Sequence, residues 1–187
     1  MVVRIWILWW DKMKSIKQLA LNALLITLAM ILSYVERFIP LQLVIPLPGI
    51  KLGLANTVTL VTLYLIDKKQ CIIILVIRCI LGSIFGGGIT GLLFSLTGGL
   101  FAITIMMIAQ KIKFLSIYGV SVLGAAFHHI GQILVSMVLM DSIYIGSYLP
   151  YLLLVSIFTG LLIAIISSKI VVALESNPKI YRQLEKE

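Results

Sequence analysis

Long uninterrupted apolar runs limit more than any other feature what this sequence can fold into. Six of them approach the length of about 20 residues that an α-helix needs to cross the hydrocarbon core of a bilayer. They lie at residues 18–38, 52–66, 71–86, 91–110, 116–140 and 151–172. With 61% hydrophobic and only 12% charged residues, the chain is too apolar for a soluble domain. The sequence therefore predicts an all-α integral membrane protein, a bundle of six transmembrane helices.

The basic residues indicate how these helices are oriented. The formal net charge is +8, but the basic residues lie mostly in short segments between the apolar runs rather than on a folded soluble surface. With both termini in the cytoplasm, twelve of them lie inside, only Arg37 and Lys51 lie outside, and Arg78 falls within a run. The opposite orientation would invert this ratio. By the positive-inside rule we expect both termini in the cytoplasm, a multi-pass protein of the cytoplasmic membrane, and no nucleic-acid partner.

The chain is expected to form one membrane domain with two short flanks. Residues 15–172 hold the six runs, and residues 173–187 form a charged cytoplasmic tail that is too short to fold alone. Residues 1–14 are expected to be an N-terminal extension or an interfacial arm, because Met13 is a more ordinary start and no small-residue cleavage site marks a signal peptide. Three aromatic residues in this arm suit the headgroup level of a membrane: Trp6, Trp9 and Trp10.

The connection between the first two runs is unusual for a loop. Residues 41–50 are apolar, and they contain Pro46 and Pro48, which are unfavourable inside a regular helix. An apolar loop exposed to water is costly, so we expect this segment to fold over the helices as a lid or plug. In the predicted topology it lies on the outer side of the membrane.

Polar side chains at membrane depth are the strongest indication of a functional site. Arg78 lies near the middle of the third run, where a charge costs on the order of 2.5–3.5 kcal/mol and so requires a partner or a water-filled cavity. In the fifth run a polar stripe follows one helix face at intervals of four residues, with His129 beside it. Its members are Gly124, His128, Gln132 and Ser136. This stripe must face protein or water rather than lipid.

Further polar groups lie at the outer ends of the first two helices, and with the intramembrane groups they outline a pocket open toward the outside. In such a pocket Arg78 or Lys51 would bind a carboxylate or a phosphate. The candidate substrate-binding residues are Glu36, Lys51, Asn56, Arg78, His128, His129 and Gln132. The alternative is purely structural: Arg78 pairs with a carbonyl or with Glu36, and the histidines and Gln132 bond to one another across helices.

Motifs for catalysis or cofactor binding are mostly missing. Residues 86–91 match G-x-G-x-x-G, but they follow a membrane helix instead of a strand, so a flexible outer turn is the better interpretation. There is no P-loop, and the seven acidic residues are not spaced to hold Mg²⁺. His128 and His129 are adjacent and point about 100° apart on a helix, which disfavours a metal site. We therefore expect no catalytic residue, no metal and no cofactor.

Small residues recur every four positions in two of the runs. In the fourth run they are Gly91, Ser95 and Gly99. In the sixth run they are Ser156, Gly160, Ala164 and Ser168. Such spacing lets helix backbones approach closely in lipid, where apolar side chains gain little by pairing. Packing within the chain is one interpretation. The other is that the row in the sixth run docks against a partner membrane protein.

Four segments resemble a bacterial membrane family that is catalogued both as heptaprenyl diphosphate synthase component I and as the Gx transporter family. They are residues 32–40, 48–56, 78–83 and 119–132, and they include the blocks GIKLGLAN (49–56) and H-x-I-G-Q (128–132). The family looks like the substrate-binding S components of energy-coupling factor (ECF) transporters. The resemblance implies a six-helix, S-component-like bundle in the bacterial cytoplasmic membrane, with the candidate residues in or near its polar pocket.

The sequence departs from these families at two places. His129 stands where an asparagine is expected in the H-x-I-G-Q block, which would alter the polarity of the pocket. The two alanines four apart that often dock the first helix of S components occur only in relaxed form. The corresponding pairs are Ala23 with Thr27 and Ala29 with Ser33. Docking of a partner through the first helix is therefore less well supported.

Two functions follow as hypotheses. The first is a substrate-binding membrane subunit for uptake of a small organic nutrient, vitamin or precursor, expected to be anionic. Since the chain has no nucleotide-binding motif, an ECF-type coupling membrane subunit and separate ATPases would supply the energy. The alternative is an accessory membrane subunit of a long-chain (heptaprenyl) diphosphate synthase in quinone biosynthesis, as the older family name states. In that case the missing aspartate motifs leave the prenyl transfer to another subunit.

Overall fold

The computed structural model describes residues 2–39 and 51–177, with side chains at 16–36, 38–39 and 51–177. The α-helices are α1 (Val2–Val35), α2 (Asn56–Leu65), α3 (Lys68–Gly82), α4 (Gly88–Ala109), α5 (Ile117–Leu139) and α6 (Leu149–Glu175). Short helical turns connect them: η1 (Glu36–Phe38), η3 (Ser83–Gly87) and η4 (Ile143–Tyr148). No strand occurs in this part of the chain. The all-α prediction is confirmed. The expected lid at 41–50 lies outside the described residues.

Four helical segments are long and apolar enough to cross a membrane. They are Ile16–Val35, Lys68–Ala109, Ile117–Leu139 and Ile143–Glu175. The second of these joins α3 and α4 through η3, and α2 has only ten residues. Ten helical residues rise about 15 Å, half the thickness of a typical hydrocarbon core. A multi-pass membrane protein is thus confirmed, while six separate crossings and two cytoplasmic termini stay predictions.

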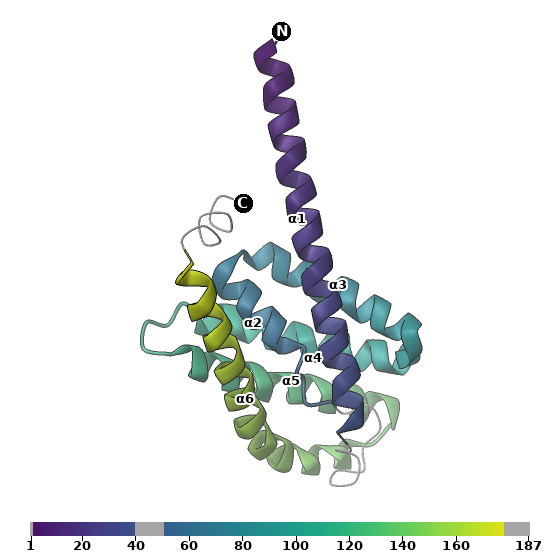
Figure 1. Ribbon diagram of the computed structural model, residues 1–187. Coiled ribbons are helices and arrows are strands. Elements are labelled where there is room, and N and C mark those ends of the chain that lie inside the picture. The colour runs from purple at the N-terminus through teal and green to yellow at the C-terminus, as the bar shows by residue number, and fades with distance from the viewer. Residues whose placement is uncertain (1, 40–50, 178–187) are drawn as a thin grey trace.

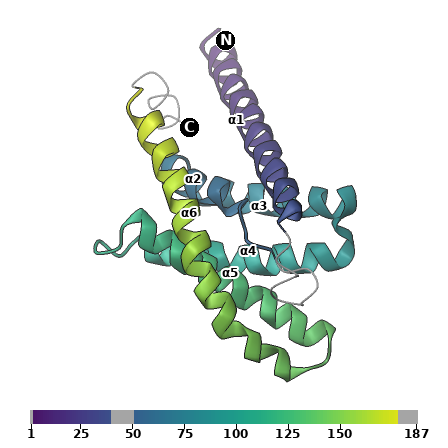
Figure 2. The ribbon, with the colours of Figure 1, turned by 60° about the horizontal axis from the view of Figure 1, so that its bottom comes forward.

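The helices do not all lie parallel to one another. Figures 1 and 2 show α3 and α4 running crosswise to α1 and α6. The N-terminal end of α1 and the C-terminal end of α6 lie toward the same side of the molecule in both views. The first part of α1 extends beyond the other helices, because α1 begins at Val2 rather than near residue 18. The predicted N-terminal arm is therefore helical and continuous with the first apolar run.

Glycines allow close backbone contacts between α4 and α5 and between α5 and α6. A Cβ on Gly131 of α5 would lie 2.9 Å from the Cα of Gly98 on α4. A Cβ on Gly160 of α6 would lie 2.6 Å from the Cα of Val122, and the Ser121 hydroxyl donates to the Gly160 carbonyl at 2.7 Å. These contacts agree with the close backbone approach that small residues permit in lipid.

The row of small residues on α6 faces this chain's own interior over most of its length. Ser156, Gly160 and Ala164 are buried, and Ser168 is half-buried, with its hydroxyl 3.5 Å from that of Tyr118. A partner could reach the buried members only by displacing helices of this chain. Packing within the chain accounts for the row in this structure, and its role in docking a partner stays a prediction.

A break separates α3 from α4 at the glycine-rich segment. Phe85 and Gly86 have non-helical backbone angles, with φ of 104° at Gly86, and Gly88 has φ of 59°. Side chains with a Cβ rarely adopt such positive φ values, which explains the glycines. The turn predicted at 86–91 is thus present over residues 85–88, while Gly91 lies inside α4.

Candidate functional site

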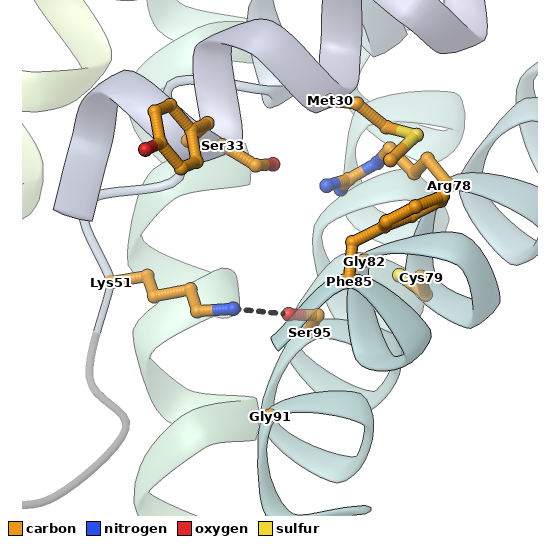
Figure 3. A pocket seen from close by; sticks show the side chains of 10 residues that line it. Met30, Ser33, Lys51, Arg78, Cys79, Gly82, Phe85, Gly91 and Ser95 are labelled. Carbon is orange, nitrogen blue, oxygen red and sulfur yellow. Dashed lines mark hydrogen bonds between the residues drawn. The ribbon is translucent and has the colours of Figure 1, made fainter. Parts of the chain in front are cut away.

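A cavity of about 60 Å³ lies between α1, α3, α4 and the segment that precedes α2. Its lining residues are Met30, Ser33, Tyr34, Lys51, Arg78, Cys79, Gly82, Phe85, Gly91 and Ser95. Figure 3 shows that the side chains of Lys51 and Arg78 reach toward this space from opposite sides. Two of the few cationic groups in this apolar protein therefore meet at one cavity.

Arg78 reaches the cavity because it lies on the inward face of α3. Cys71, Ile74, Leu75, Arg78 and Cys79 are the buried residues of this helix, and their spacing of three or four defines one face. Arg78 is only 7% exposed. This inward orientation avoids the free-energy cost of a charge in lipid, because the guanidinium lies among protein groups.

Each of the two cations donates a hydrogen bond to a neutral polar side chain. The Lys51 ammonium donates to the Ser95 hydroxyl at 2.9 Å, and one terminal nitrogen of Arg78 donates to the Asn56 side-chain oxygen at 3.4 Å. The buried Nε of Arg78 has no hydrogen-bond partner. A guanidinium has five N–H donors in a planar fork that matches carboxylate or phosphate oxygens. The cavity thus offers donors and positive charge to an anion.

Glu36 holds the segment that carries Lys51. Its carboxylate is 5% exposed and accepts hydrogen bonds from the backbone N–H groups of Gly53 at 2.7 Å and Leu54 at 3.2 Å. Gly53 has φ of 83°, and a Cβ there would lie 2.9 Å from the Asn56 side-chain nitrogen. Only glycine fits this tight approach to α2. Glu36 therefore positions the cavity wall but does not line the cavity.

The polar stripe of α5 forms a second, connected cluster. In the orientation that satisfies its neighbours, the Gln132 amide nitrogen donates to the Lys51 carbonyl and to His129 Nδ1, each at 3.2 Å. The amide oxygen then accepts from the Lys51 N–H at 3.2 Å and from His128 Nε2 at 3.1 Å. Gln132 and His129 are fully buried, and His128 is nearly so. The stripe faces protein, as predicted, and it holds the backbone of Lys51 through Gln132.

The seven candidate residues form two layers, but they do not share one hydrogen-bonded network. Gln132 joins Lys51, His128 and His129, whereas Arg78 bonds to Asn56 and Glu36 to the backbone of Gly53 and Leu54. Lys51 and Arg78 line the cavity, whereas the others lie behind them. Those others are Glu36, Asn56, His128, His129 and Gln132. In the inner layer the histidines bond to Gln132 as the structural alternative expects, but within α5 rather than across helices. Arg78 bonds to the Asn56 side chain rather than to Glu36. A direct contact of this layer with a ligand stays a prediction.

Sequence reasoning missed several lining residues. Tyr34 and Phe85 contribute aromatic rings to the rim, and Ser33 and Ser95 contribute hydroxyls. The sequence marks Ser95 only as a member of the small-residue row in the fourth run, which also contains Gly91. Ser33 lies three residues before Glu36 and so shares its helix face. Only this spacing along the helices could have indicated Ser33 and Ser95 as lining residues. A serine alone does not distinguish a cavity wall from a helix contact.

The described residues do not provide a metal centre. No group of three or more His, Cys, Asp or Glu side chains that could hold a metal ion is found among them. Cys71 and Cys79 are free and buried, and the Cys71 thiol donates to the Thr59 carbonyl at 3.4 Å. The cavity lining contributes hydrogen-bond donors and the positive charges of Lys51 and Arg78.

The fold and the cavity define a multi-pass helical membrane protein with a buried, cation-lined site. Residues 25–170 match the model of the family described as Heptaprenyl diphosphate synthase component I. This match covers most of the chain, so the protein belongs to that family. Comparisons with curated proteins and with solved structures found no match. The family description agrees with the synthase hypothesis, and these comparisons give no support to the transport role or to ECF-type partners.

The Gln132 network leads to a first prediction about stability. Gln132→Leu keeps a similar volume but leaves four buried polar groups, on Lys51, His128 and His129, without their present partner. We expect the unfolding free energy to fall by at least about 1–3 kcal/mol, the cost of an unsatisfied buried group. Gln110→Leu is the matched control, because Gln110 donates only one hydrogen bond, to Leu63 at 3.3 Å. Thermal melting in detergent should show the larger decrease for Gln132→Leu; equal decreases would contradict the network.

Proposed function

We propose that this chain is a membrane-embedded accessory component of a long-chain prenyl diphosphate synthase, and that its cavity binds an anionic phosphate group. The observation that carries the proposal is the convergence of Lys51 and Arg78 on one cavity in a chain of this family. Arginine and lysine are the usual phosphate-binding side chains, and in a low-dielectric site their attraction for an anion is stronger than in water. In this proposal prenyl transfer itself takes place on a separate catalytic subunit.

The accessory role follows from the physical chemistry of the product. Each methylene group moved from water into lipid gains about 0.8 kcal/mol, so a long prenyl chain strongly favours the bilayer while its diphosphate favours water or cationic partners. A membrane protein that holds the diphosphate end lets the chain leave a catalytic subunit directly into lipid. Lys51 and Arg78 would bind and orient the phosphate, and the buried network behind them would keep both cations in place.

A reconstitution experiment tests this function. The catalytic prenyl diphosphate synthase from the same organism is assayed with nanodiscs that contain this chain and with empty nanodiscs. We expect this chain to raise the steady-state turnover of long-chain product, because transfer of the product into lipid frees the synthase for its next turnover. The first turnover should remain unchanged. Identical turnover with both kinds of nanodisc would contradict the proposal.

A second candidate function is the substrate-binding subunit for uptake of a small anionic nutrient, with an ECF-type coupling subunit and ATPases as partners. The observation in its favour is the positive-inside count, which places Lys51 on the outer side. The two functions differ in what copurifies with the chain. ATPases together with a water-soluble acid would support uptake, whereas a prenyl synthase subunit or a prenyl phosphate would support the accessory role.

A further inference from the structure

The size of the cavity limits how much of a ligand it can enclose. Pockets that enclose a whole small-molecule ligand have volumes of about 300–1,000 Å³. The cavity at Lys51 and Arg78 has about 60 Å³, which is room for a few water molecules or one small charged group. Only the anionic end of a ligand fits between the two cations. The remainder of the ligand must lie outside the cavity.

The rim of the cavity is apolar and exposed. Tyr34 on α1 is 59% exposed and Phe85, at the break between α3 and α4, is 69% exposed. Ile84 and Ile89 beside this break are exposed as well. In a membrane protein, exposed apolar side chains of this kind are suited to contact with lipid. The mouth of the cavity is therefore suited to an apolar chain.

Two glycines in the lining leave space for such a chain. A Cβ built on Gly82 or on Gly91 would meet no atom within 4 Å. In contrast, Gly98 and Gly99 on the same helix as Gly91 are packed closely against His128 and Leu75. The glycines at the cavity are thus not required by helix packing. At these two positions no side chain projects from the cavity wall (Figure 3).

We propose that the cavity binds only the phosphate end of a lipid-soluble phosphate ester, a prenyl diphosphate, whose hydrocarbon chain leaves past Phe85 and Gly91 into the bilayer. This inference rests on the proposed function, because it names the ligand class of the same site. Arg78 lines the cavity, its buried Nε has no hydrogen-bond partner, and its guanidinium supplies one side of the phosphate site. The Lys51 ammonium supplies the other side, next to the Ser95 hydroxyl. The ligand reaches this site sideways from the membrane.

Binding to the purified full-length chain in phosphatidylcholine nanodiscs tests the inference. The three probes are farnesyl diphosphate, inorganic diphosphate and farnesol, so that head and tail are measured together and apart. We expect farnesyl diphosphate to bind at least about tenfold more tightly than either of the other two. A fourth probe, phosphatidic acid added to the nanodisc, measures whether an ordinary phospholipid competes. Equal binding of inorganic and farnesyl diphosphate would overturn the proposed role of the tail.

Variants assign the binding to this cavity. Lys51→Met should lower the affinity for farnesyl diphosphate about tenfold, and Lys51→Arg should retain most of it. Lys113→Met, in the exposed loop after α4, is the control and should leave the affinity unchanged. Gly91→Leu adds bulk at a position where a Cβ would meet no atom within 4 Å. It should lower the affinity for farnesyl diphosphate more than the affinity for inorganic diphosphate. Melting temperatures show that each variant is folded. Unchanged affinity in folded Lys51→Met would place the ligand elsewhere.

The same nanodiscs separate this inference from the proposed function. If the chain raises the turnover of the synthase but binds no prenyl diphosphate at this cavity, the accessory function stands and the ligand inference fails. If the chain binds farnesyl diphosphate with the expected variant pattern but leaves the synthase unchanged, the ligand inference stands and the accessory function fails.

Discussion

Replacing Arg78 by leucine is expected to remove most of the affinity of this protein for phosphate-containing ligands. Arg78 is buried, contacts Asn56, lines the cavity, and has a buried Nε without a hydrogen-bond partner. Loss of a buried charge-assisted interaction costs about 2–3 kcal/mol, or roughly 30- to 150-fold in Kd. Titration of the variant with farnesyl diphosphate in nanodiscs measures this change directly.

Arg78→Lys separates the charge of this residue from its shape. A lysine keeps the positive charge but lacks the planar fork that binds phosphate through two nitrogens, so an intermediate affinity is expected. Thermal melting of both variants shows whether the fold is retained. An Arg78→Leu protein that is folded and binds as tightly as the wild type would show that the guanidinium has only a structural role.

Replacing Gly131 by leucine is expected to produce the largest loss of stability of any single substitution considered for this chain. A Cβ at this position would lie 2.9–3.1 Å from backbone atoms of Thr97 and Gly98 on α4. Because backbone atoms cannot rotate away, α4 and α5 would have to separate along their contact. Overpacking typically costs about 1–3 kcal/mol, and the additional atoms of leucine at a backbone contact place this variant at or above the upper end.

Gly91→Ala is the matched control for this substitution. Its Cβ would meet no atom within 4 Å, and alanine is favoured over glycine inside a helix by about 0.8–1 kcal/mol. We therefore expect opposite signs: a lower melting temperature for Gly131→Leu and an equal or higher one for Gly91→Ala. If both variants melt at the wild-type temperature, the close contact between α4 and α5 is absent in the membrane.

Hydrophobicity alone predicted most of the helical segments. Their ends depend on capping residues and glycine turns, which a hydrophobicity pattern does not show. The runs at 116–140 and 151–172 agree well with α5 and α6. The run at 71–86 begins three residues late, because Asp67 caps α3 by accepting from the Lys69 N–H at 3.2 Å. The run at 52–66 begins early, because Gly53 turns with a positive φ before α2 starts at Asn56.

The candidate site was predictable where polar groups stand out against an apolar background. Arg78 was predicted because a charge at membrane depth is costly and needs a specific environment, and Lys51 because it lies at the outer end of the second apolar run. The same reasoning selected His128 and Gln132, but the fold is needed to show that they lie behind the cavity and bond to each other. Tyr34 and Phe85 carry no such signal. Their place at the rim depends on how α1 meets the break between α3 and α4.

Photo-crosslinking shows most directly whether Lys51 and Arg78 hold the phosphate end of a prenyl chain inside the membrane. A prenyl diphosphate with a diazirine in its first isoprene unit is bound to the protein in nanodiscs, irradiated, and its attachment sites are mapped by mass spectrometry. The expected labels lie on residues 30–34 and 82–91, which border the mouth of the cavity, and excess unlabelled ligand should suppress them. Labels that are concentrated on the outer faces of α5 and α6, or that persist unchanged in Arg78→Leu, would contradict the account.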